Sequence, residues 1–346
     1  MYKYIKGSLL FTFIGLITAM GFQYWQTENI TSVLVAGWTA LILAVLEISL
    51  SFDNAVVNAT VIRKMDPVWK KRFLTWGILI AVFGMRLIFP VTIVGIVANI
   101  NPIEAFKLSI QNPARYSELM TSTHLTVAAF GGMFLYMVFL HFFMNEEKED
   151  HWVTFIEKPL VLLSQYKGIE LIVALLTLLS ITSYLSAEVQ KSFLVAGLWG
   201  MITYMTVHSF SDWLEEKELM LQTGKSMLSA GFGMFLYLEI LDASFSFDGV
   251  IGAFAITQSL VQIMIGLSIG AFFVRSLTLY LVEKNTLNQF RFLEHGAFYA
   301  LGALAMMMLL DSFFHIPEWM TGLTGAIILA FSILWSFHVD RKSRTE

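Results

Sequence analysis

The sequence of 346 residues contains no cysteine. This absence excludes a disulfide framework, thiolate metal ligands and thiol redox chemistry. Charged residues are also scarce, at 14% of the chain, and the net charge is only −4. No long basic tract is present, so nucleic-acid binding has no electrostatic basis. The chain also lacks an HExxH pair, a GxSxG elbow and a P-loop, and we therefore do not expect an enzyme.

Apolar residues dominate instead, at 57% of the chain, which exceeds their usual share in a soluble domain. They form runs long enough to cross a bilayer, for which a helix needs roughly 20 residues. We predict an all-α polytopic membrane protein with about ten transmembrane helices. The expected spans are 8–25, 33–61, 73–97, 125–144, 168–186, 193–210, 228–256, 260–282, 295–311 and 319–339. The second and seventh are long for a bilayer, so we expect tilt or a break near their serine and glycine residues.

The positions of the basic residues predict the topology. Most lysines and arginines fall into segments that alternate along the chain, on the same side as the N-terminus. Because basic residues concentrate in cytoplasmic loops, both termini are predicted to be cytoplasmic. A linker over about 145–167 carries an acidic run and is predicted to be a solvated cytoplasmic segment.

One seven-residue phrase occurs twice, as Glu47-Ile-Ser-Leu-Ser-Phe-Asp53 and as Asp242-Ala-Ser-Phe-Ser-Phe-Asp248. Further pairs keep the same spacing, and these are Gly77, Ala81 and Arg86 against Gly266, Gly270 and Arg275. The second and seventh spans are an odd number of crossings apart, so the two copies must run in opposite directions. We predict an inverted repeat, with helices 1–5 in residues 1–190 and helices 6–10 in residues 191–346.

A carboxylate inside hydrocarbon costs roughly 2.5–3.5 kcal/mol, so the repeated acids need a compensating role. We interpret the two phrases as halves of one buried cation site. Helical periodicity places carboxylates and hydroxyls on shared or neighbouring stripes of each helix, and such oxygen ligands suit hard divalent ions. The residues expected along the substrate path or around the ligands are Ser49, Ser51, Glu239, Ser244, Ser246, Arg86 and Arg275.

The charges in the spans do not balance. The interior acids are Glu47, Asp53, Glu239, Asp242 and Asp248, against only two interior arginines. Three negative charges would stay uncompensated if all the acids ionised, so the site should take up metal, protons or each in turn. Arg86 and Arg275 are either permanent counter-ions or occupants that release the acids when metal binds. His124, His208 and His295 could be ligands, proton carriers or hydrogen-bonding groups at helix ends, and the sequence assigns them no role.

In its two repeated acidic phrases, Glu47–Asp53 and Asp242–Asp248, the sequence resembles the TerC-like integral membrane proteins, and within them the DUF475 branch. The resemblance implies a bacterial inner-membrane protein related to manganese exporters and tellurium-resistance proteins. It also implies a metal site formed by Glu47, Asp53, Asn54, Asp242 and Asp248. One departure is Gly249, which stands where the family phrase continues with serine or asparagine.

The expected function is therefore Mn²⁺ efflux by alternating access, with protons as a candidate coupling ion. The expected partners are the lipid bilayer and the divalent cation, and no resident cofactor is expected. The alternative is a non-transporting membrane scaffold linked to tellurium or envelope-stress resistance, in which the buried acids are structural.

Overall fold

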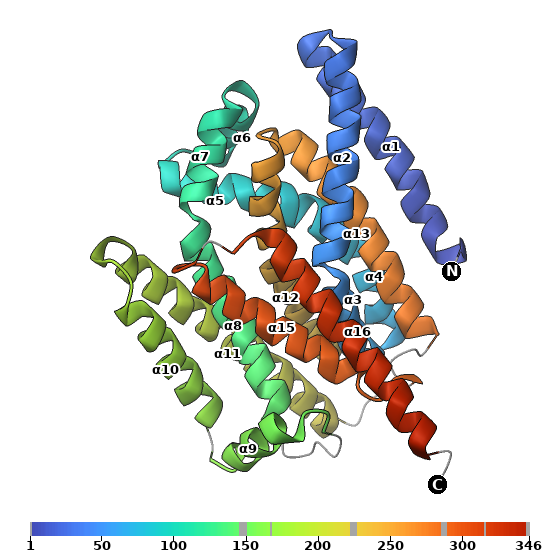
Figure 1. Cartoon of the computed structure of the whole chain (residues 1–346), viewed down its shortest axis with the longest axis vertical. Coiled ribbons are helices and arrows are strands. Elements are labelled where there is room, and N and C mark those ends of the chain that lie inside the picture. The colour runs from blue at the N-terminus through green and yellow to red at the C-terminus, as the bar shows by residue number, and fades with distance from the viewer. Residues whose placement is uncertain are drawn as a thin grey trace.

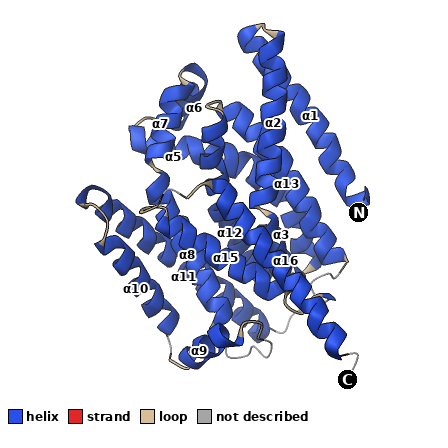
Figure 2. Cartoon of the chain, in the orientation of Figure 1, coloured by secondary structure: helices blue, strands red, loops and turns tan. Residues whose placement is uncertain are grey.

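The computed structural model describes residues 2–144, 151–166, 168–221, 227–284, 289–314 and 316–343. All regular secondary structure in these ranges is helical (Figure 2), as the sequence predicted. The acidic run of the expected linker, residues 146–150, lies outside the described residues.

The first part of the chain is broken into short helices after two long ones. These are α1 (Tyr2–Thr27), α2 (Ile30–Leu50), α3 (Phe52–Lys64), α4 (Pro67–Leu79), the π-helix η1 (Ile80–Ile88), α5 (Phe89–Ala98), α6 (Pro102–Gln111), α7 (Pro113–Ser122) and α8 (His124–Phe143). The later helices are α9 (Thr154–Ser164), α10 (Ile169–Ser183), α11 (Ala187–Leu221), α12 (Met227–Ile256), α13 (Leu260–Glu283), α15 (Leu293–Leu310) and α16 (Glu318–Ser343).

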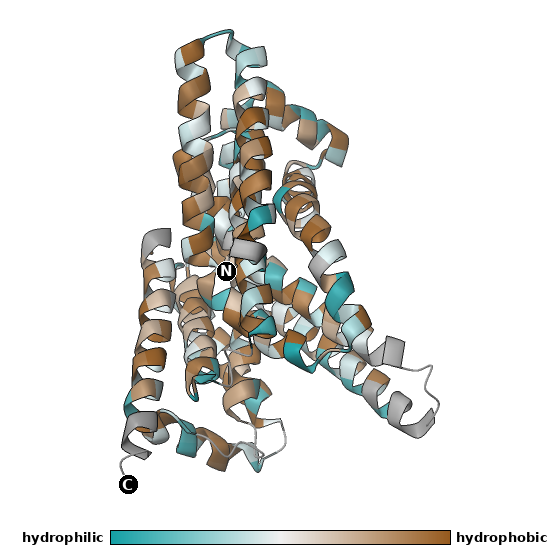
Figure 3. Cartoon of the chain, turned by 90° about the vertical axis from the view of Figure 1, so that its right-hand side faces the viewer, coloured by the Kyte–Doolittle hydropathy of each residue, from teal (hydrophilic) through white to brown (hydrophobic). Residues whose placement is uncertain are grey.

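Eight helical segments among the described residues are long and apolar enough to cross a membrane. Figure 3 shows apolar residues along the length of the long helices, including the one that ends at the C-terminus. The α9 and α10 helices bend by 114° against each other and would make a ninth span if they form one broken crossing. The 30-residue α12 is not among these eight, which were counted over the described residues.

The helices pack into two groups that meet at α12 (Figure 1). The α13 helix packs along α1 and α2, while α11 packs along α8 and α12. The α15 helix joins the groups, because it contacts α8, α16 and α3. Close approach is possible where glycines face a neighbour, as at Gly266 and Gly270 of α13, which lie against α2.

Of the two long spans in which we expected tilt or a break, one is broken. The α2 helix ends at Leu50 and α3 begins at Phe52, so the second span is interrupted at Ser51. The seventh span is the continuous helix α12, from Met227 to Ile256.

Candidate functional site

The interruption at Ser51 follows from the polar residues that surround it. Ser51 leaves the helical conformation, with φ −107° and ψ 16°. Asp53 and Asn54 then occupy the first turn of α3, where short polar side chains and negative charge are favoured. The Ser51 hydroxyl turns back one helical turn and donates a hydrogen bond to Glu47 Oε1 at 3.2 Å. The break therefore carries its own polar partner for the buried Glu47 carboxylate.

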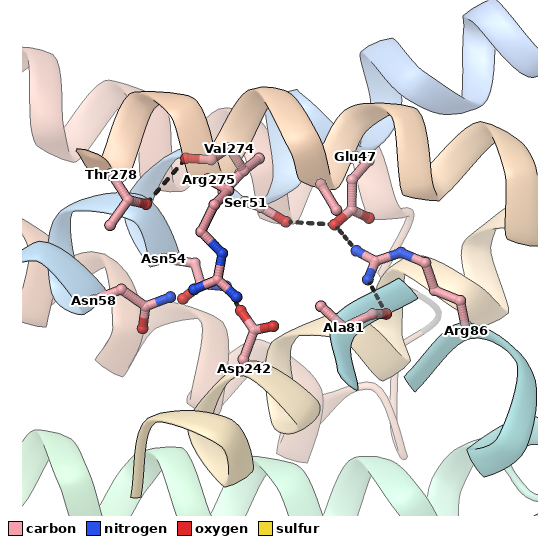
Figure 4. Close-up of a pocket in the computed structure, with 11 residues that line it drawn as sticks. Glu47, Ser51, Asn54, Asn58, Ala81, Arg86, Asp242, Val274, Arg275 and Thr278 are labelled. Carbon is pink, nitrogen blue, oxygen red and sulfur yellow. Dashed lines mark hydrogen bonds and ion pairs between the residues drawn. The ribbon is translucent and has the colours of Figure 1, made fainter. Parts of the chain in front are cut away.

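A polar stripe continues through this break, from Glu47 and Ser51 to Asn54 and Asn58. Successive members are four, three and four residues apart, which keeps them on one helical face. The stripe lines a cavity of about 20 Å³ between α2, α3, η1, α12 and α13 (Figure 4). The lining residues are Glu47, Ser51, Asn54, Asn58, Ala81, Arg86, Asp242, Ala271, Val274, Arg275 and Thr278. Such a volume holds about one water molecule, which is also the scale of a small ion.

The π-helix η1 supplies the first arginine of the cavity. Pro90 follows η1 in the first turn of α5 and cannot donate a backbone hydrogen bond to the preceding turn, which disturbs the regular α-helix there. Arg86, only 2% exposed, donates from Nη1 to the Ala81 carbonyl oxygen at 2.5 Å. Its Nη2 forms a buried ion pair with Glu47 Oε1. Glu47 is therefore bound by one guanidinium and one hydroxyl.

The second half of the chain contributes a matching acid and arginine. Asp242 of α12 accepts a hydrogen bond from Asn54 Nδ2 at 2.9 Å, which joins the residue after the first repeated phrase to the first residue of the second. The Arg275 guanidinium points toward Asp242 in Figure 4 and lies 3.9 Å from the centre of the Phe73 ring. A Cβ atom at Gly77 would meet Arg275 Nη2 and Glu239 Oε1 at 2.6 Å each. Gly77 thus leaves room for both charged side chains.

Two oxygen atoms of the lining have no hydrogen-bond partner. Asn54 Oδ1 and Asn58 Oδ1 are buried and unpaired, and each residue is 3% exposed. A buried polar atom without a partner costs roughly 1–3 kcal/mol, so such atoms need a role. Together with the carboxylates of Glu47 and Asp242, these amide oxygens form a set of hard oxygen donors around one small cavity.

The structure brings together only part of the expected site. Six of the predicted residues line the cavity, and these are Glu47, Asn54, Asp242, Ser51, Arg86 and Arg275. The expected ligand Asp53 is buried but turns to α16, where its Oδ2 would lie 3.2 Å from a Cβ atom at Gly325. The side chain of Asp248 lies outside the described part of the structure. Asn58 and Thr278 were not predicted, although Asn58 continues the Glu47 stripe.

The remaining predicted pathway residues lie away from the lining. Ser49 is exposed and donates to the Val45 carbonyl oxygen at 2.9 Å. Ser244 donates to the Ile240 carbonyl at 3.0 Å, and Ser246 is buried with its hydroxyl unpaired. Glu239 lies beside Gly77, just outside the lining.

The cavity is charge-balanced, unlike the span interior as a whole. Its lining holds two carboxylic acids, Glu47 and Asp242, and two arginines, Arg86 and Arg275. With all four ionised the net charge is zero, whereas the sequence predicted an excess of three negative charges for the whole interior. No group of three or more His, Asp or Glu side chains suited to a metal occurs among the described residues. A cation can therefore bind here only if the arginines give up their acids.

The histidines lie beside acids elsewhere and do not belong to this lining. His124 lies 3.3 Å from Asp311 across the ends of α8 and α15, and His208 lies 3.5 Å from Asp212 within α11. His295 Nε2 lies 3.7 Å from the buried Glu157 of α9. The His124 and His295 contacts join different helices, and none of these histidines lines the cavity.

Sequence comparison gives one match. The profile of a family described as "Protein of unknown function (DUF475)" matches residues 52–343. No curated protein and no solved structure matches the chain.

Proposed function

The chain belongs to the DUF475 family. We propose that it is a membrane transporter for a divalent cation, with Mn²⁺ as the expected substrate. The substrate site is the cavity between Glu47 and Asp242. The observation that carries the proposal is that both repeated phrases reach one cavity, the first with Glu47 and the second with Asp242, beside the unpaired oxygens of Asn54 and Asn58.

We propose that the two halves form an inverted repeat. Its support is a reciprocal packing pattern, since α2 packs on α13 as α12 packs on α4 and η1. Likewise α3 contacts α15 as α12 contacts α8. Each half also contributes one acid and one arginine, Glu47 with Arg86 and Asp242 with Arg275. Transporters built in this way bind their substrate where the halves meet.

The proposed topology has ten spans, which are the eight apolar ones, the bent α9–α10 pair and α12. The membrane is then the bacterial inner membrane, and both termini lie on its cytoplasmic side. The resemblance to TerC-like proteins is part of this proposal, and so is the direction of transport, from the cytoplasm outward.

The proposed mechanism is an exchange of arginine for substrate. In the charge-balanced state Arg86 holds Glu47 and Arg275 lies beside Asp242. A divalent cation brings two positive charges and can replace both guanidinium groups at the two carboxylates. The oxygens of Asn54 and Asn58 would complete its coordination, because they are unpaired in the balanced state. Protons are the proposed coupling ion, since they too can neutralise a carboxylate that an arginine has left.

Uptake of Mn²⁺ into inside-out vesicles or proteoliposomes tests the proposal. Glu47→Gln and Asp242→Asn should each abolish uptake while the protein stays folded and inserted. Ser49→Ala is the control, because Ser49 belongs to the same repeated phrase but is exposed. Wild-type uptake in both carboxylate variants would refute the proposed site.

A second candidate function is a non-transporting scaffold, of the kind linked by resemblance to tellurium or envelope-stress resistance. The buried Arg86–Glu47 ion pair favours it, because paired charges can join helices without any substrate. The two functions differ in one measurement. A scaffold shows no Mn²⁺ uptake, and its carboxylate variants lose stability instead.

A further inference from the structure

A second cavity adjoins the Glu47–Asp242 cavity. It has a volume of about 320 Å³ and lies between the start of α4 and the end of α13. Its lining residues are Ile62, Pro67, Lys70, Lys71, Thr75, Thr278, Leu279, Val282 and Glu283. Thr278 belongs to the lining of both cavities. We call the larger cavity the vestibule, and it lies beside the α3–α4 turn, since Ile62 and Pro67 belong to its lining.

Two helix faces connect the cavities. On α3 the polar stripe ends at Asn58, and one turn further on Ile62 lines the vestibule. On α13 the sequence of lining residues runs from Arg275 through Thr278 to Val282. Both faces therefore leave the small cavity in the same direction. Thr278 is common to both linings, and it is 1% exposed, while Asn58 at the end of the polar stripe is 3% exposed.

The opposite end of the small cavity is closed by apolar packing. One turn before Glu47, Leu43 is fully buried in a cluster with Val250, Phe254 and Leu267. Cβ atoms at Gly266 and Gly270 would meet Leu43 Cβ at 2.6 Å and Glu47 Cβ at 2.5 Å, so α2 and α13 touch closely there. The α6 and α7 helices add Ala105, Tyr116 and Met120 to the same cluster.

We propose, building on the cation site above, that the substrate reaches this site through a half-channel from the vestibule, with Asn58 and Thr278 forming its constriction. Asn58 lines the small cavity and its Oδ1 is buried and unpaired, so in this proposal it gives a passing cation an oxygen ligand before the cation meets Glu47 and Asp242. The apolar cluster around Leu43 is the closed gate on the other membrane side. In this proposal the route leads toward the α3–α4 turn, and the buried Asn58 and Thr278 separate the site from the vestibule.

The absence of cysteine makes a direct test possible, because any introduced thiol is the only one in the chain. Thr278→Cys is the test variant and Ser268→Cys is its matched control. Both replace a hydroxyl by a thiol on α13, and both residues are 1% exposed, but Ser268 lies ten residues nearer the closed end. Thr75→Cys, at an exposed position of the vestibule, is the positive control.

Each variant is reconstituted as the full chain and treated with a membrane-impermeant cationic methanethiosulfonate from one side at a time. Thr278→Cys should react from the vestibule side more slowly than Thr75→Cys, and Mn²⁺ should slow the reaction. Ser268→Cys should stay unmodified from that side. If Thr278→Cys resists the reagent while Thr75→Cys reacts, or reacts only from the other side, the half-channel is refuted.

A conservative second variant guards against a folding defect. Thr278→Ser keeps the hydroxyl and should retain Mn²⁺ uptake, whereas Thr278→Val should reduce it with an unchanged melting temperature. The two proposals fail separately. If Thr278→Cys is labelled but the wild-type protein takes up no Mn²⁺, the half-channel is supported and transport is refuted. Mn²⁺ uptake without this labelling refutes only the path.

Discussion

Arg86→Gln tests the exchange of arginine for cation. The substitution removes the guanidinium that binds the Glu47 carboxylate, which is 3% exposed. Removing one partner of a buried ion pair destabilises a protein by roughly 3–5 kcal/mol, because the other charge stays buried and unpaired. Without a divalent cation, the variant should therefore unfold at a lower temperature than the wild-type protein.

With the cation present, the Arg86→Gln variant should bind Mn²⁺ more tightly than the wild-type protein. In the wild-type protein Mn²⁺ must displace Arg86, and a hydrogen bond to a charged group contributes roughly 1.5–3 kcal/mol. In Arg86→Gln this competitor is gone. The Kd for Mn²⁺ should fall by roughly 10- to 100-fold, since about 1.4 kcal/mol corresponds to a factor of ten.

The assay is thermal unfolding of the purified full chain over a Mn²⁺ titration, with calorimetry for the Kd. Arg63→Gln is the matched control, because Arg63 pairs with Glu294 at 3.8 Å and both side chains are partly exposed. Such a surface pair contributes at most about 1 kcal/mol. A double variant, Glu47→Gln with Arg86→Gln, should regain stability but lose the enhanced binding. The reasoning is refuted if Arg86→Gln binds Mn²⁺ with the wild-type Kd.

Three further perturbations have defined outcomes. Gly270→Ala would place a methyl group 2.7 Å from the Ala44 carbonyl oxygen. It should therefore lower the free energy of unfolding by roughly 1–3 kcal/mol. The control Gly21→Ala has open space around the new methyl group and should not lower the melting temperature. Lys71→Gln removes a positive charge from the vestibule lining and should raise the initial Mn²⁺ uptake rate at low ionic strength. This increase should be smaller at about 0.15 M salt, because salt screens the charge. A lower rate would indicate an anionic substrate. Asp53→Asn should retain most Mn²⁺ uptake, and its complete loss would show that Asp53 is a ligand.

The repeated phrases were the most informative part of the sequence. They contain acids where hydrocarbon disfavours them. Helical periodicity puts Glu47 and Asn54, seven residues apart, on one face, and both line the cavity. Asn54 and Asp242, which lie 188 residues apart, form a direct hydrogen bond. The match between Arg86 and Arg275 likewise pointed to the two arginines that line the cavity.

Periodicity could not decide which of two neighbouring faces turns into the cavity. Ser49 and Asp53 share a face, and that face lies toward α16, where Gly322 and Gly325 approach α2 and α3 closely. The position of α16 depends on packing between distant parts of the chain. Spacing within a single helix carries no information about it.

Two other features needed the tertiary structure for different reasons. Asn58 extends the Glu47 stripe by one turn and was visible in the sequence, but it lies outside the repeated phrase. Thr278 looks like many threonines of apolar helices, since its hydroxyl donates to the Val274 carbonyl oxygen at 3.0 Å. Only its place between two cavities distinguishes it. The π-helix had a sequence signal in Pro90, which interrupts an otherwise helical run.

The most direct measurement of the central claim is anomalous diffraction at the manganese edge from crystals of the full chain grown with Mn²⁺. The account predicts an anomalous peak within coordination distance of the Glu47 and Asp242 carboxylates, with Arg86 turned away from Glu47. An anomalous peak confined to other residues, with the Arg86–Glu47 ion pair intact under saturating Mn²⁺, would contradict it.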